Sequence, residues 1–139
     1  MLSFSLLQES DKDKIIPFLR ILNQNILEEV LTERLIEMFV QGYKCVGIFD
    51  DEKMIGVSGL WIITKYYIGK HIEPDNVIIQ PEYQGKGIGK YLMQWIYEYA
   101  KSQGCVASEL NCYVTNHAGQ KFWANEGYKI IGFHYQKML

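Results

Sequence analysis

The stretch NVIIQPEYQGKGIGKYLMQWIYEYAKSQG, from Asn76 to Gly104, decides the fold. It begins with a β-branched run, which predicts a strand over residues 76–80 that stops at Pro81. Three glycines follow, and beyond them apolar residues recur at helical spacing as far as Gly104. The sequence therefore predicts a glycine loop that joins a strand to the N-terminus of a long amphipathic helix.

This glycine loop suits a bound diphosphate. The first backbone N–H groups of a helix have no partners, and together with the helix dipole they form an anion site. Glycines let a phosphate approach the backbone, and Lys86 and Lys90 add positive charge. A Walker A loop or a dinucleotide fingerprint would need glycine where the chain has Lys90 or Leu92, so both patterns fail. The pattern that remains is Q-x-x-G-x-G, formed by Gln84, Gly87 and Gly89.

Length and composition limit the class of protein. The 139 residues predict a single domain over 1–139, and 48% hydrophobic with 22% charged residues is typical of a globular protein. A net charge of −2 without a basic cluster argues against a nucleic-acid partner. No apolar run approaches the ~18 residues of a membrane span, and the N-terminus does not resemble a signal peptide. Three cysteines without CxxC spacing indicate neither a metal site nor a disulfide framework, so we expect a cytoplasmic protein.

The rest of the chain predicts a mixed α/β (α+β) fold with the order β-α-α-β-β-β-α-β-α-β. Ser10 and Thr32 are the expected N-caps of two early helices, and a polar turn at residues 50–53 joins two strands. After the glycine loop and its helix come a strand over 106–114, a helix over 116–126 and a last strand over 128–139.

Two stretches resemble the GNAT superfamily of N-acetyltransferases. IIQPEYQGKGIGKYLM, residues 78–93, is similar to its acyl-CoA-binding signature [QR]-x-x-G-x-[GA], which follows a strand ending in proline. NHAGQKFWANEGYKIIG, residues 116–132, resembles a later segment of the family. The resemblance covers the chain from Val46 onward. It implies a mostly antiparallel sheet with a parallel central strand pair, flanked by about four helices.

The resemblance also implies that acetyl-CoA is the cosubstrate. Backbone amides of the loop would bind its pyrophosphate, and the loop residues concerned are Gln84, Gly85, Lys86, Gly87, Ile88, Gly89 and Lys90. The strand residues Val77, Ile78 and Ile79 would pair with the pantetheine arm, and a backbone N–H there would polarise the thioester carbonyl. Asn116 would contact the pantetheine or the phosphates, cap a helix, or do both. Trp123 would pack against the pantetheine or in the core.

The implied reaction moves an acetyl group to a primary amine by direct attack in a ternary complex, which requires a base. Glu73 and Asp75 are the candidate bases, and a solvated turn is the alternative for both; His71 is a third candidate. Family members often carry a tyrosine acid where this chain has Trp123, whose indole is not a practical proton donor. Tyr128 is therefore the candidate acid, with Tyr113, water or unassisted departure of the thiolate as alternatives. Cys112 would permit a ping-pong route, although free cysteines are usually inert.

The acceptor is expected to be a small-molecule amine, with a protein amine as the alternative. Glu28, Glu29, Glu33 and Glu37 would suit a cationic amine or form a solvated helix face. A non-catalytic acyl-CoA-binding sensor and a nucleotide-binding module are the other functions that the sequence leaves open. The last segment, YKIIGFHYQKML, has no turn for the expected final hairpin, so a second subunit could complete the sheet in a homodimer.

Overall fold

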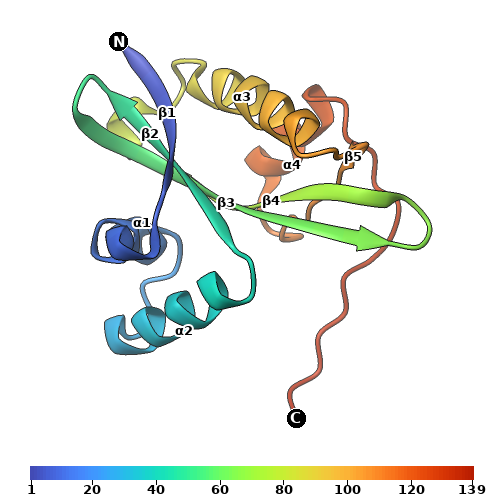
Figure 1. The fold of residues 1–139 in the computed structure, drawn as a ribbon, viewed down its shortest axis with the longest axis horizontal. Helices are drawn as coiled ribbons and strands as arrows, with labels where there is room; N and C mark the ends of the chain where they lie inside the picture. Colours follow the sequence, from blue (N-terminus) through green and yellow to red (C-terminus); the bar gives the residue numbers. More distant parts are fainter.

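A computed structural model describes all residues from 1 to 139 (Figure 1). Its strands are β1 (Leu2–Leu7), β2 (Lys44–Asp50), β3 (Lys53–Lys65), β4 (Gly69–Ile79) and β5 (Ala107–Ser108). Its α-helices are α1 (Lys12–Leu22), α2 (Glu28–Val40), α3 (Ile88–Ser102) and α4 (His117–Asn125), and two short 3-10 helices are η1 (Glu9–Asp11) and η2 (Pro81–Tyr83). The observed order agrees with the predicted one as far as α4.

One mixed sheet with the strand order β1-β2-β3-β4-β5 forms the centre of the molecule. Neighbouring strands from β1 to β4 are antiparallel, while β4 and β5 are parallel through the pairs His71↔Ala107 and Ile72↔Ser108. The polar turn predicted at residues 50–53 is confirmed, because it joins β2 to β3, with Asp51 at φ 52°. The predicted class, a mostly antiparallel sheet with one parallel pair and four helices, is confirmed.

The two faces of the sheet carry separate hydrophobic cores. Helices α1 and α2 cover one face and bury residues such as Ile15 and Leu35 against Cys45 and Val57. Helix α3 covers the opposite face and buries Leu92, Met93 and Ile96 against Val46, Ile48, Ile55, Leu60 and Ile72. Successive residues of a strand point to opposite faces, which is why Cys45 and Val46 belong to different cores.

The helix starts differ from those predicted. Helix α2 begins at Glu28, four residues before Thr32, and the Thr32 hydroxyl donates to the Glu28 carbonyl at 2.9 Å from inside the helix. The predicted cap at Thr32 is therefore wrong. The N-cap residue of α1 is Asp11 rather than Ser10, and its carboxylate does not cap α1 but accepts from the Gln8 N–H at 2.8 Å at the start of η1. Pro17 lies within α1.

Strand β4 is longer than predicted and is kinked by a bulge. It begins at Gly69, so that residues 71–75 belong to a strand and not to a solvated turn. Val57 pairs with Ile78 and Gly59 pairs with Asp75, which leaves Asn76 and Val77 opposite one β3 residue. Asn76 takes the left-handed conformation with φ 53°. Such a bulge leaves backbone groups unpaired and re-aims the strand.

The C-terminal part differs most from the prediction. The strand expected over 106–114 forms only at Ala107 and Ser108, and the strand expected over 128–139 does not form. Residues 129–139 instead run away from the sheet as an extended, exposed segment (Figure 1). No helix is both long and apolar enough to cross a membrane.

Candidate active site

The glycine loop presents open backbone at the start of α3. Gly85 and Gly87 have φ angles of 75° and 79°, a left-handed conformation that favours glycine, and a Cβ at either position would meet nothing within 4 Å. Gly87 is the N-cap of α3, and no side chain caps the helix there. The first N–H groups of α3 are therefore not bonded to a capping side chain, and the anion site expected from the sequence stays a prediction.

Neighbouring contacts hold this loop in place. The Gln84 side-chain amide donates to the Ile79 carbonyl at 2.9 Å, which ties the loop to the end of β4. The Lys86 ammonium lies 5.3 Å from the centre of the Tyr83 ring, so its charge stays beside the loop. At Gly89 a Cβ would lie 3.0 Å from Phe122, which shows that α4 packs closely against the first turn of α3.

A pocket opens where β4 and β5 diverge. Their parallel pairing covers only two residue pairs, followed by one bond from the Glu109 N–H to the Ile72 carbonyl at 3.0 Å. The pocket has a volume of about 250 Å³ and is lined by Trp61, Ile63, Glu73, Pro74, Asp75 and Asn111. The candidate bases Glu73 and Asp75 thus share one pocket, on the face of the sheet that α1 and α2 cover. They lie just before the bulge at Asn76.

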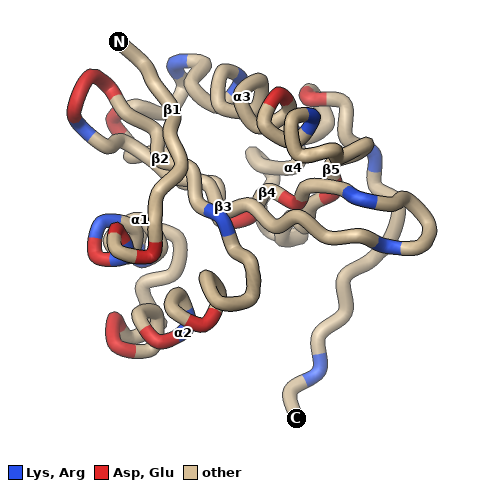
Figure 2. Tube along the Cα trace, viewed as in Figure 1, with Lys and Arg blue, Asp and Glu red and all other residues tan.

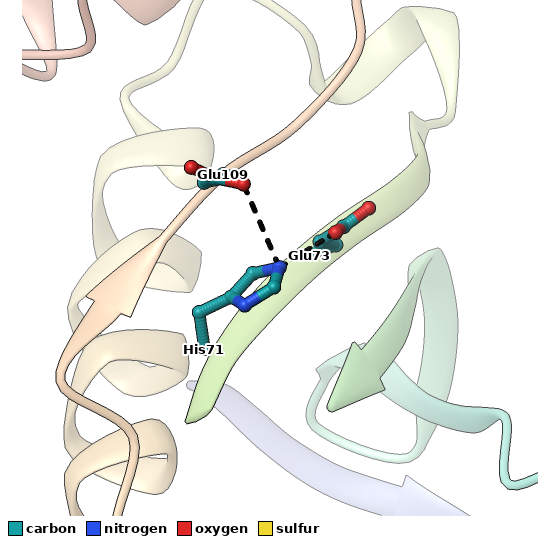
Figure 3. Close-up of side chains that lie close together, drawn as sticks. All are labelled: His71, Glu73 and Glu109. Atoms are coloured by element: carbon teal, nitrogen blue, oxygen red, sulfur yellow. Dashed lines mark hydrogen bonds and ion pairs between the residues drawn. The ribbon is translucent and has the colours of Figure 1, made fainter. Parts of the chain in front are cut away.

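A buried histidine holds Glu73. The His71 side chain is completely buried, and its Nε2 lies 2.7 Å from Oε2 of Glu73 and 3.7 Å from Oε1 of Glu109 (Figure 3). The Lys65 ammonium lies 3.6 Å from the same Glu73 oxygen. No protein group bonds to the other carboxylate oxygen, Oε1. One oxygen of Glu73 is therefore fixed, and the other is free to accept a proton.

The hydrogen bonds of His71 determine where protons lie. Its Nδ1 is 3.2 Å from the Gly69 carbonyl, which can only accept, so Nδ1 carries a hydrogen. The contact of 2.7 Å between Nε2 and Glu73 Oε2 holds the other side of the ring. The pair lies next to the Glu109 carboxylate.

Two residues of this cluster, Lys65 and Glu109, were not predicted from the sequence. The Tyr67 hydroxyl donates to the Glu109 carboxylate, and this hydrogen bond raises the pKa of Tyr67 to about 12. One ligand atom each from His71, Glu73 and Glu109 lies within 4.8 Å of the others, a grouping that could hold a metal ion. In the structure the contact between His71 and Glu73, the Lys65 ammonium and the Tyr67 hydroxyl satisfy these groups.

Asp75 forms the other side of the pocket. Its carboxylate accepts a hydrogen bond from Trp61 Nε1 at 3.2 Å, and the Trp61 ring packs on Tyr43 with 5.2 Å between ring centres. Figure 2 shows acidic residues both along α2 and at the β4–β5 junction. Carboxylates beside an aromatic face favour a positively charged ligand.

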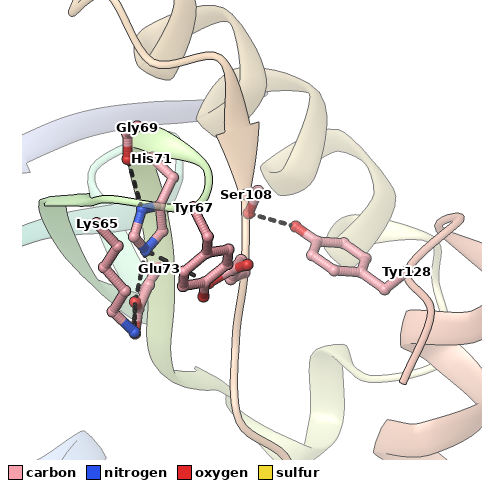
Figure 4. A network of polar contacts seen from close by, with 8 residues as sticks. Lys65, Tyr67, Gly69, His71, Glu73, Ser108 and Tyr128 are labelled. Atoms are coloured by element: carbon pink, nitrogen blue, oxygen red, sulfur yellow. Dashed lines mark hydrogen bonds and ion pairs between the residues drawn. The ribbon is translucent and has the colours of Figure 1, made fainter. Parts of the chain in front are cut away.

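Tyr128 lies apart from the two candidate bases. Its hydroxyl is 2.7 Å from Ser108 Oγ, and Figure 4 shows it across β5 from His71 and Glu73. Burial raises the pKa of Tyr128. Trp123 packs edge-on against Phe122 and Tyr128, with ring centres 4.9 and 5.4 Å apart. The structure therefore does not bring Tyr128 and Trp123 together with Glu73.

Asn116 and Cys112 lie in the segment that leads into α4. The Asn116 side chain accepts from the Gly119 N–H at 2.9 Å, which confirms its role as the N-cap of α4. Burial raises the pKa of the Cys112 thiol, so it carries less of the thiolate that nucleophilic catalysis needs. This observation counts against the ping-pong route.

Comparison with known proteins identifies the family of this chain. Residues 11–128 match the family model described as the acetyltransferase (GNAT) family. The chain is 30% identical over 67 residues to an aminoalkylphosphonate N-acetyltransferase of Salmonella typhimurium. That match covers 48% of this chain and 44% of the relative, so the aligned part is less than half of either protein.

Solved structures share the fold over the whole chain. A possible acetyltransferase from Clostridium difficile 630 superposes with a TM-score of 0.83 and 17% identity, covering 100% of this chain and 98% of the other. Glucosamine-6-phosphate N-acetyltransferase from Arabidopsis thaliana superposes with a TM-score of 0.72 and 23% identity, covering 99% of this chain and 98% of the other. Aminoglycoside N-acetyltransferase AAC(6')-Iy in complex with CoA superposes with a TM-score of 0.83 and 14% identity, covering 100% of this chain and 96% of the other.

Proposed function

Because the chain belongs to the GNAT acetyltransferase family, we propose that it transfers the acetyl group of acetyl-CoA to the primary amine of a small cationic molecule. The observation that carries this proposal is Glu73, which is held through one oxygen by His71 and is free at the other. It lies in an acidic pocket on the same strand that leads to the glycine loop. Strand β4 thus carries the proposed base and leads directly into the proposed cofactor loop.

The glycine loop fits the cofactor. Open space above Gly85 and Gly87 and the uncapped first turn of α3 suit a pyrophosphate, which the Lys86 and Lys90 side chains would help to neutralise. The bulge at Asn76 and Val77 supplies backbone on β4 that is not paired with β3. Acetyl-CoA supplies a thioester whose carbonyl carbon can bond to an amine nitrogen while the carbon–sulfur bond breaks.

Glu73 removes the proton that keeps the amine unreactive. A protonated amine has no free electron pair, so its proton must leave before or during attack. The free oxygen of Glu73 accepts this proton, directly or through one water. His71 and Lys65 act as positioning residues, because they bind the other oxygen and orient the carboxylate.

The pocket supports a cationic acceptor. Glu73 and Asp75 line it together with the Trp61 ring, and Oε1 of Glu109 lies 3.7 Å from His71 Nε2. Two of the proteins named above are an aminoalkylphosphonate N-acetyltransferase and an aminoglycoside N-acetyltransferase. Both names specify small molecules that contain amines, which agrees with this substrate class. A peptide amine remains the alternative acceptor and belongs in the same assay.

The first test is thermal unfolding of the protein with acetyl-CoA, coenzyme A, ATP and NAD, each in turn. A ligand at 100 times its Kd adds about 2.7 kcal/mol to the free energy of unfolding. We expect both coenzyme A forms to raise Tm and the other two to leave it unchanged. Stabilisation by ATP or NAD alone would support a nucleotide-binding module instead.

The second test is release of free thiol from acetyl-CoA with a panel of amines. The panel contains aminoalkylphosphonates, hexosamine phosphates, polyamines, aminoglycosides and a peptide with a free N-terminus. Turnover of any small amine supports the enzyme. Binding of acetyl-CoA without turnover across the panel would favour the non-catalytic acyl-CoA-binding sensor.

A further inference from the structure

We propose that the acceptor is a short diamine, whose reacting amine faces Glu73 and whose second ammonium group binds at Asp75 beside the Trp61 ring. This inference rests on the proposed function, because it names the substrate of the same pocket. It gives Asp75 a role in recognition instead of catalysis.

The ionisable groups that line the pocket are all negative. The pocket is lined by Trp61, Ile63, Glu73, Pro74, Asp75 and Asn111. Two carboxylates are therefore its only ionisable groups, and Lys65, which lies 3.6 Å from Glu73, is not among the lining residues. A ligand with a phosphonate, phosphate or carboxylate beside its amine would bring another negative charge to these carboxylates. A ligand with two positive charges instead gives each carboxylate a partner.

Asp75 keeps one carboxylate oxygen free. Its Oδ2 accepts from Trp61 Nε1 at 3.2 Å, and no protein group bonds to Oδ1. The same hydrogen bond holds the indole beside the carboxylate, and the face of a tryptophan ring attracts a cation. A free carboxylate oxygen next to this ring is therefore suited to an ammonium group.

A buried hydroxyl beside Asp75 has no hydrogen-bond partner. The Tyr43 side chain is 2% exposed, and its hydroxyl is not bonded to any protein group. This oxygen lies over Gly59, where a Cβ would be only 2.5 Å away, and Gly59 pairs directly with Asp75. Directly paired residues of antiparallel strands direct their side chains to the same face, so the hydroxyl is aimed at the Asp75 side of the pocket. An ammonium group has three N–H donors for such unpaired oxygens.

The spacing of the two carboxylates selects a short chain. Glu73 and Asp75 are two residues apart on one face of β4, which separates them by about 6.5 Å. With bonds of about 1.5 Å, a chain of about four or five methylene groups places two nitrogens at this separation. Ile63 and Pro74 supply apolar surface for the methylenes. The pocket volume of about 250 Å³ equals about eight water volumes, which suits this chain better than a multi-ring aminoglycoside.

The test compares amines of similar length that differ at the far end. Thiol release from acetyl-CoA gives kcat/KM for 1,4-diaminobutane, n-butylamine, γ-aminobutyrate and aminopropylphosphonate. We expect the diamine to exceed butylamine by about 10- to 100-fold, the value of one hydrogen bond to a charged group, and the two anionic compounds to react most slowly. Equal values for the diamine and butylamine, or a preference for an anionic compound, would overturn the proposal while leaving acetyl transfer to amines intact.

A matched pair of variants tests the role of Asp75. Asp75→Asn should lower the ratio of kcat/KM for diaminobutane to that for butylamine by about tenfold or more, because the amide carries no charge. Asp13→Asn, the same change at an exposed residue of α1, should leave this ratio as it is. An unchanged ratio in Asp75→Asn would show that Asp75 does not recognise the far end of the acceptor, and would refute the subsite.

Calorimetry separates the subsite from the reaction. Titration of diaminobutane in the presence of coenzyme A reports binding without any turnover. Binding that is lost in Asp75→Asn, even if no amine is acetylated, would support the subsite and count against acetyl transfer. Absence of binding at millimolar diamine would overturn the proposal. The comparison of amines on the unmodified chain stays decisive if Asp75→Asn does not fold.

Discussion

His71 Nε2 and Glu73 Oε2 lie 2.7 Å apart on two residues that point to the same face of β4. The contact joins a fully buried ring to a carboxylate that lines a pocket, and so connects the interior of the sheet with the proposed site of reaction. It also fixes which oxygen of Glu73 is available to a substrate.

Replacing Glu73 by Gln should lower kcat by about 100- to 10,000-fold, the usual contribution of a general base. The amide keeps the shape of the side chain but cannot take the proton of the amine. Affinity for acetyl-CoA should stay the same, because the glycine loop is untouched. Thiol release and calorimetric binding measure the two quantities. Glu98→Gln on α3, an exposed residue away from the pocket, is the control.

Gly87→Ala and Gly42→Ala form a matched pair at the cofactor loop. Both glycines have positive φ, 79° and 105°, and a Cβ at either would meet nothing within 4 Å. Each variant should lose about 1–2 kcal/mol of stability from backbone strain. Only Gly87→Ala should also lose affinity for coenzyme A, by tenfold or more, because its Cβ occupies the space in front of the α3 N-terminus. Equal affinities in a titration would mean that the loop is not the binding site.

Tyr128→Phe should leave kcat within about threefold of the unmodified protein and lower the free energy of unfolding by about 1 kcal/mol, the value of one hydrogen bond. The hydroxyl is bonded to Ser108 across β5 from Glu73, and burial raises its pKa, which makes it a weaker acid. Steady-state kinetics and urea unfolding give both numbers. A loss of kcat above 100-fold with unchanged stability would restore Tyr128 as the proton donor to the departing thiolate.

Stability should fall on the alkaline side of pH 9. Burial raises the pKa of Cys45 from 9.0 to about 12, and burial also raises the pKa of Tyr43 beside it. Above pH 9 the unfolded chain releases the Cys45 proton while the folded chain retains it. The stabilisation is therefore complete below pH 9 and is lost as pH rises towards 12, by about 1.4 kcal/mol per pH unit for one group.

Urea unfolding from pH 8 to 11 measures this slope, and Cys45→Ala should make it shallower. The substitution also lowers stability at every pH by leaving a cavity, so the comparison uses the slope and not the absolute value. An unchanged slope in the variant would mean that the loss of stability at alkaline pH comes from tyrosines alone.

Most of the fold follows from local patterns in the sequence. Period-2 and period-3.6 apolar spacing predicted the strands and helices up to α4, and the glycine loop was predicted with its position at the start of α3. The final strand was predicted from composition, but strand pairing depends on a neighbour that composition does not specify. The bulge at Asn76 had no sequence signal, because asparagine is also common in turns.

The candidate active site was only half predictable. Glu73 and Asp75 were named as bases, yet the Pro74 between them suggested a turn, and the buried pairing with His71 was not foreseen. The spacing of His71 and Glu73 would have placed them on one face had residues 69–79 been assigned to a strand. Glu109 could not be found, because only the parallel pairing of β4 with β5 brings it near residues 36 and 38 positions earlier in the chain.

The separate cores on the two faces of the sheet bear on how such a protein can be altered. The proposed acceptor pocket lies on the face of the sheet that α1 and α2 cover, whereas the glycine loop continues into α3, which packs on the other core. We therefore expect substitutions of the pocket residues Trp61, Ile63 and Asn111 to change the selectivity of the proposed enzyme for its amine without disturbing the glycine loop. Diversification of substrate range, by natural selection or in a directed-evolution library, should accordingly concentrate at these lining residues and spare α3.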